Sequence, residues 1–61
     1  MEAEKVNFIK IYSKLPTKIR EDIIVVIEGK PYTWDVAYFE VNNDTVTGAK
    51  ILKKLKELGI I

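Results

Sequence analysis

Residues 23–41 read I-I-V-V-I-E-G-K-P-Y-T-W-D-V-A-Y-F-E-V, and the secondary structure of this stretch decides the fold. It opens with five consecutive β-branched residues, whose stiff side chains favour a strand. That strand would turn at Gly29-Lys30-Pro31 and pair with residues 32–41. A helix over residues 17–28 fits as well, since Gly29 is a usual helix stop. Its apolar residues recur at i, i+4, i+7 and i+8: Ile19, Ile23, Val26 and Ile27. Periodicity does not decide between the two for so short a run.

The second half of the stretch favours a helix over residues 33–41. Strict alternation would place a charge among large apolar groups on both faces, so neither face is that of a half-buried strand. Thr33 suits the N-cap and Asp35 the first turn. Helical spacing groups four apolar side chains: Trp34, Ala37, Tyr38 and Val41. The polar run at residues 42–44 then ends the helix.

Two amphipathic segments flank this region. Apolar residues at i, i+3, i+4 and i+7 predict a helix over residues 3–14, which Pro16 stops. A second stripe at i, i+4 and i+7 predicts a helix over residues 45–58, with Gly59 as a left-handed cap.

The sequence therefore predicts one domain over residues 1–61, mainly α, with an N-terminal helix within residues 1–15 and a core over 17–61. The alternative is an α+β fold of order α-β-β-α, with a β-hairpin within residues 23–41. Because an isolated two-stranded sheet is marginally stable in water, such a hairpin would pair with a second copy.

Composition narrows the function. The 61 residues include no cysteine or histidine, which excludes disulfides and zinc sites built from those ligands. Ser13 is the only serine, no glycine-rich phosphate loop occurs, and the acidic residues show no distinctive spacing, so we expect no enzyme, cofactor, metal or small-molecule ligand. No apolar run approaches the roughly 18 residues of a membrane span, and we expect a cytoplasmic protein. Abundant Ile, Lys and Glu without Gln resemble a hyperthermophile's composition.

The charge is unevenly distributed along the chain. Residues 45–61 carry four lysines and one glutamate, a charge of +3, whereas residues 1–44 carry −2. This asymmetry favours an anionic partner for the C-terminal helix. The alternative is that the lysines simply form a solvated helix face and bind no partner.

The order of parts resembles the helix-turn-helix core of winged-helix transcription regulators. I-R-E-D-I-I-V-V-I-E-G-K-P-Y resembles the first core helix and its turn, T-W-D-V-A-Y-F-E-V the second helix, and K-I-L-K-K-L-K-E-L-G-I-I the end of a recognition helix. The chain departs from the pattern at Glu40, where the family has glycine, in about two extra residues before the last helix, and in lacking a wing after residue 61. Gly48 inside that helix also costs about 1 kcal/mol relative to alanine.

The resemblance implies that the protein binds double-stranded DNA as a transcription regulator, with helix 45–58 in the major groove. The residues expected to face bases are Asn42, Asn43, Thr45 and Thr47. Those expected at phosphates are Lys50, Lys53 and Lys54, with Tyr32 and Thr33 at the backbone. Each has a structural alternative, since the asparagines form a turn in any fold, and Thr45 or Thr47 is suited to an N-cap.

The other hypothesis is a non-catalytic interaction module or small structural dimer with no role in nucleic-acid binding. Part of the first helix would then be exposed and would form a homodimer interface. Its residues are Phe8, Ile9, Ile11 and Tyr12. A homodimer would also suit the DNA hypothesis, because two recognition helices roughly 34 Å apart match a palindromic site.

Overall fold

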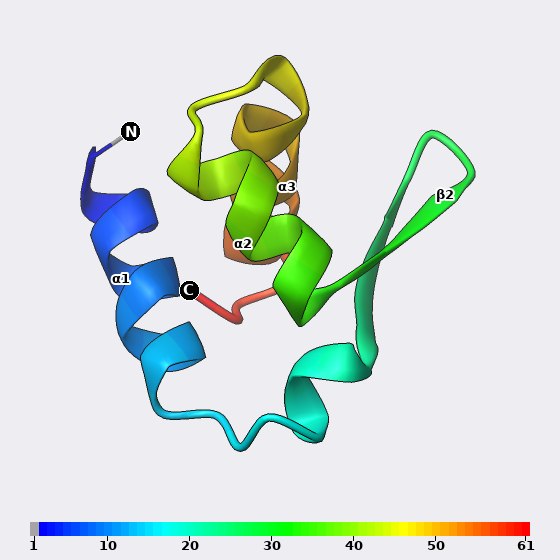
Figure 1. Ribbon diagram of the computed structural model, residues 1–61. Helices are drawn as coiled ribbons and strands as arrows, with labels where there is room; N and C mark the ends of the chain where they lie inside the picture. Colours follow the sequence, from blue (N-terminus) through cyan, green and yellow to red (C-terminus); the bar gives the residue numbers. More distant parts are fainter. Residues whose placement is uncertain (1) are drawn as a thin grey trace.

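A computed structural model, which describes residues 2–61, divides the decisive stretch into a β-hairpin and a helix (Figure 1). The elements follow in the order α1 (Glu2–Ser13), the 3₁₀ helix η1 (Ile19–Glu21), β1 (Ile23–Ile27), β2 (Lys30–Thr33), α2 (Trp34–Asn42) and α3 (Val46–Glu57). Within residues 2–61 the fold is thus mainly helical, with one small antiparallel hairpin. This agrees with the predicted mainly α or α+β fold class.

The predictions of helices over 3–14, 33–41 and 45–58 are confirmed, each to within one residue. The prediction of a helix over 17–28 is wrong, because that segment forms η1 and β1. The β-branched run prevails over the helical spacing there. The first core helix of the helix-turn-helix resemblance is therefore absent, and only α2 and α3 remain of its three helices. The predicted hairpin over 23–41 ends at Thr33.

The turn of the hairpin is one residue earlier than predicted. Glu28 and Gly29 both have positive φ, at 51° and 80°, and Ile27 pairs with Lys30. Two central residues with positive φ define the two-residue turn whose twist matches that of paired strands. A bulge between Ile23 and Val25 bends the base of the hairpin, and β2 then continues directly into α2.

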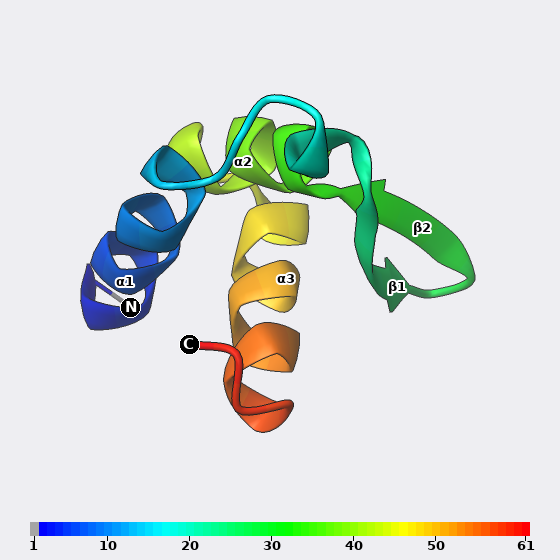
Figure 2. The ribbon, with the colours of Figure 1, turned by 90° about the horizontal axis from the view of Figure 1, so that it is seen from below.

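Helix α3 lies at the centre of the molecule, with α1 on one side, the hairpin on the other, and α2 crossing its N-terminal end (Figure 2). Its buried side chains, Ile51, Leu52 and Leu55, form the middle of the core. Helix α1 contributes Phe8, β1 contributes Val25, and α2 contributes Ala37 and Val41. The predicted left-handed cap at Gly59 is confirmed by its φ of 77°, and the Ile60 N–H donates to the Leu55 carbonyl over 2.9 Å.

The crossing of α2 and α3 depends on Gly48. A Cβ atom at this position would lie 2.5 Å from the Glu40 carbonyl oxygen and 2.7 Å from its carbon. Thr45, the N-cap of α3, accepts a hydrogen bond from the Gly48 N–H over 2.9 Å. Its hydroxyl donates to Glu40 Oε1 over 2.5 Å, and its N–H donates to the Glu40 carbonyl. Two of the departures from the helix-turn-helix pattern, Gly48 inside α3 and Glu40 near the end of α2, therefore belong to one contact between the two helices.

Aromatic stacking holds α1 against α2. The Tyr12 and Tyr38 rings stack with centroids 4.3 Å apart, and Phe8 lies 5.7 Å from Trp34. The Tyr12 hydroxyl donates to Asp35 Oδ1 over 2.6 Å. This bond to a carboxylate raises the pKa of Tyr12, because it stabilises the neutral phenol. The Arg20 guanidinium packs on the Tyr12 ring and donates a hydrogen bond to the Tyr12 backbone carbonyl, near the C-terminal end of α1.

We predict that Gly48→Ala destabilises the protein by about 1–3 kcal/mol, because the new methyl group meets backbone atoms that cannot rotate away. Helix propensity alone predicts the opposite sign, a gain of about 1 kcal/mol. Denaturant unfolding followed by the fluorescence of Trp34, the single tryptophan, measures the difference.

The matched control is Ala49→Gly at the exposed neighbouring position, where only the propensity cost of about 1 kcal/mol is expected. A Gly48→Ala variant as stable as the wild type, or more so, would show that the helices do not need this close approach.

Candidate interaction surface

Three of the polar residues predicted to contact DNA, two at bases and Thr33 at the backbone, cap helices in the structure. Asn43 donates from Nδ2 to the Phe39 carbonyl over 2.8 Å and so caps α2. Thr45 is the N-cap of α3, and Thr33 is the N-cap of α2, accepting from the Val36 N–H over 3.2 Å. Of the other predicted polar contacts, Asn42 is exposed and Thr47 is half-buried. The structural alternative thus accounts for three of these positions.

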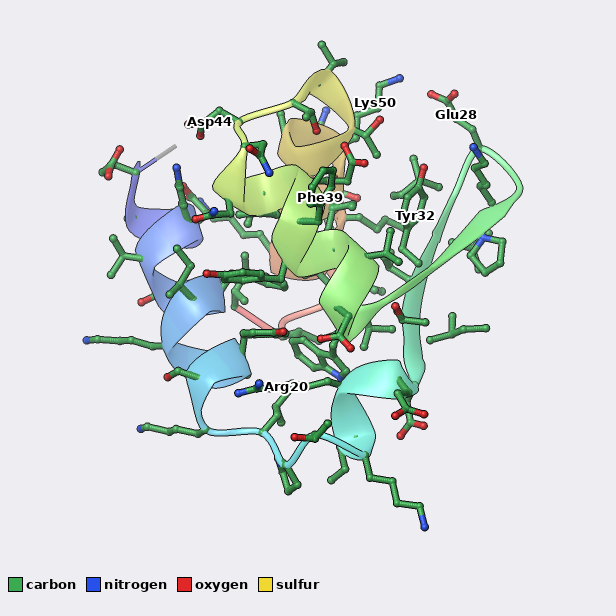
Figure 3. All side chains as sticks on the ribbon, viewed as in Figure 1. Arg20, Glu28, Tyr32, Phe39, Asp44 and Lys50 are labelled. Atoms are coloured by element: carbon green, nitrogen blue, oxygen red, sulfur yellow. The ribbon has the colours of Figure 1, made fainter. Side chains whose placement is uncertain are left out.

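Two lysines of α3 are held by carboxylates from other elements. Lys50 Nζ lies 2.5 Å from Glu28 Oε2 at the tip of the hairpin, and Lys56 Nζ lies 2.9 Å from Glu4 Oε2 on α1. Figure 3 shows Lys50 and Glu28 converging above the space between α3 and the hairpin. Each lysine lowers the pKa of its carboxylate, chiefly through the hydrogen bond. Lys53 and Lys54 are exposed, and none of the ion pairs within residues 2–61 includes them.

The residues predicted as a dimer interface pack largely inside the protein. Phe8 is completely buried, with 0% of its surface exposed, so it is not available to a second copy and the prediction is wrong at this residue. Ile9 and Tyr12 pack against the core, and Ile11 is half-buried. Tyr32, predicted to touch the DNA backbone, also packs against the core from β2.

An exposed apolar surface that the sequence did not predict lies on the hairpin. Ile23 and Val26 have 60% and 56% of their surface exposed, and Pro31, opposite Val26, is exposed as well. Val26 and Pro31, which lie opposite each other on the two strands, form what we call the outer face of the hairpin, and Ile23 is exposed at its base, beyond the bulge. Val25, whose side chain points to the other side, is buried against the core. An unbroken apolar run was the available signal, since a strand with one solvated face normally alternates with polar residues.

Helix α2 carries a second exposed apolar group. Phe39 has 62% of its surface exposed and projects from the side of α2 nearest the viewer in Figure 3. Val36, one turn earlier, is exposed too. Contiguous exposed apolar groups of this kind mark contact surfaces more often than single scattered residues do.

A small half-open pocket of about 120 Å³ lies between the N-terminal ends of α1 and α3, with Lys5 and Asp44 at its edge. These two residues form an ion pair at 2.9 Å, which satisfies the charges beside it. Within residues 2–61, no three acidic, histidine or cysteine side chains come together as a metal site would require. In the same range, no helix combines the length and apolarity needed to cross a membrane.

Comparison of the chain with protein-family models, with curated proteins and with solved structures finds no match.

The Lys50–Glu28 pair gives a measurable prediction. We expect Lys50→Gln to return the pKa of Glu28 to about its ordinary value of 4.5, because the largest cause of its lowering is removed. Since the folded-state pKa is depressed, the stabilisation from this pair is present above the unfolded value and is lost as the pH falls through the folded pKa.

NMR titration of the Glu28 side-chain carboxyl carbon measures both values. The control is Lys53→Gln, which removes the same charge from the same helix without touching Glu28. An equal shift in both variants would mean that the general charge of α3, not the pair, lowers the pKa.

Proposed function

We propose that the chain is a non-catalytic protein–protein interaction module whose contact surface is the hairpin. The observation that supports this most strongly is the exposure of Ile23 and Val26 on a strand that carries no charged residue. Apolar surface gains about 25 cal/mol for each Å² removed from water, so a partner that covers this face is favoured. The cysteine-free composition fits a cytoplasmic setting, which we include in the proposal.

The hairpin is presented in a fixed position, which favours binding. Val25 anchors β1 in the core, Tyr32 anchors β2, and Lys50 holds the turn through Glu28. A surface that is already ordered loses less conformational freedom when it binds. This anchoring distinguishes the hairpin from a loosely attached loop.

Photo-cross-linking tests the module. We expect a photoreactive residue at position 26 to form a protein adduct in cell extract, because that position lies within the contact surface. An excess of unlabelled wild-type chain should suppress an adduct with any other protein, or should itself be captured if the partner is a second copy, whereas a Val26→Lys chain should do neither.

The control places the same photoreactive residue at Val46, which is more exposed than Val26 but lies on α3. Equal adducts at both positions, or an adduct at position 26 that the wild-type chain neither suppresses nor joins, would contradict a specific surface on the hairpin.

The second candidate function is binding of duplex DNA, favoured by one observation. Lys53 and Lys54 are exposed side by side on α3, and they belong to the segment with a charge of +3. In this proposal α2 and α3 act as a helix-turn-helix pair, as the winged-helix resemblance implies, and the protein is a transcription regulator. Lys53 and Lys54 would contact phosphates, with Asn42 and Thr47 nearer the bases.

For DNA binding, we predict that affinity falls steeply between about 50 and 200 mM salt. In a plot of the logarithm of the binding constant against the logarithm of the salt concentration, the double variant Lys53→Glu with Lys54→Glu should reduce the magnitude of the slope by about 2. Fluorescence anisotropy with a labelled duplex measures both effects. The control is Lys10→Glu with Lys14→Glu, which makes the same charge change at exposed positions in the last turn of α1 and just after it. No binding at low salt, or equal losses in both double variants, would count against this function.

A further inference from the structure

We infer that the partner of the hairpin is a second copy of this chain, joined β1 edge to β1 edge in a continuous four-stranded antiparallel sheet. This inference rests on the proposed interaction module and identifies its partner. It follows from a difference between the two edges of the hairpin.

The alternation of hydrogen bonds along the hairpin shows which backbone groups point outward. Ile27 and Lys30 flank the two-residue turn, so they form a hydrogen-bonded pair. The next pair, Val26 and Pro31, is then a non-hydrogen-bonded pair, and the backbone groups of both residues point away from the hairpin. By the same alternation, Val25 and Tyr32 form the next hydrogen-bonded pair.

The two outward edges therefore differ chemically. On β2 the outward residue is Pro31, which has no N–H and cannot donate to another strand. On β1 the outward residue is Val26, which offers both an N–H and a carbonyl. None of the hydrogen bonds formed outside the hairpin within residues 2–61 uses the backbone of Ile23–Ile27.

The open edge suits another β1 strand in particular. When Val26 of one copy lies opposite Val26 of the partner subunit, the two residues exchange both N–H···O bonds around a twofold axis. The five β-branched residues carry no charge, so no like charges oppose each other in the paired strands. Beyond them, Asp22 approaches the turn of the other copy, where Lys30 is exposed and Glu28 is already paired with Lys50.

Pairing also completes the sheet. A two-stranded sheet is marginally stable alone, whereas four strands with one apolar face packed on helices are stable. The outer faces of the two hairpins then adjoin across the twofold axis, where the two Val26 side chains are cross-strand neighbours and cover part of each other's exposed surface. Because Pro31 blocks both new edges, the assembly closes at two copies and does not extend into a fibre.

Two measurements on the full chain test this inference. Analytical ultracentrifugation should show the mass rising from 7.0 kDa to twice that value, at concentrations between about 10 µM and 1 mM. Over the same range, amide exchange observed by NMR should slow at Val26 by about tenfold or more, while Val25 and Ile27 are protected throughout.

Two variants separate the edge from the side chain. Val26→Pro removes the outward N–H at a position that does not bond within the hairpin, and it should remain monomeric with the circular dichroism of the wild type. Val26→Thr keeps the N–H and a β-branched shape, and it should still dimerise. If Val26→Pro does not fold, the exchange of Val26 in the wild-type chain still decides the question.

The outcomes also separate this inference from the module itself. A wild-type chain that stays monomeric at 1 mM would overturn self-pairing, even if position 26 forms suppressible adducts with another protein. A dimer whose Val26 amide exchanges as fast as in the monomer would overturn edge pairing. Absence of both dimer and specific adduct would remove the module as well.

Discussion

The contact between the Glu40 carbonyl and Gly48 determines how the rest of the molecule is arranged. Because no side chain separates the two backbones, α2 crosses α3 closely, and Thr45 fixes the angle of the turn by bonding to both residues. The direction of α2 then places its two neighbours. The hairpin runs straight into its N-terminal end, and α1 stacks its aromatic rings on its side. A shift at this crossing would move the hairpin and α1 with it.

The helices could be predicted from the sequence because each has a local signal: an apolar period, a capping threonine, or a terminating proline or glycine. The segment before β1 could not be, because Ile19, Ile23 and Ile27 fit a helical stripe as well as a strand. The choice depends on which residues the core covers. Val25 is buried by α3 and Val26 is not, and neither fact is encoded locally. Gly48 is a second case that the sequence does not explain. Its low helix propensity looks unfavourable until the Glu40 backbone that packs against it is known.

The candidate site was less predictable than the fold. The lysines of α3 were identified correctly as a basic helical face, but Glu28 and Glu4, which pair with two of them, lie 22 and 52 residues away in sequence. Sequence spacing gives no sign of such pairs. In the same way, the threonines and asparagines chosen as DNA contacts include three helix caps, because capping and base recognition favour the same small polar side chains. The exposed hairpin was missed because a run of apolar residues predicts burial.

The position of α1 has a consequence for the order in which the chain folds. The α2–α3 turn closes through a bond between residues only five apart, and the hairpin closes around two residues. Helix α1, by contrast, is attached through pairs separated by 23, 39 and 52 residues. Contacts between distant residues form late, because more of the chain must be ordered first. We therefore expect the hairpin, α2 and α3 to assemble first, with α1 docking last and opening first as a unit in the folded protein.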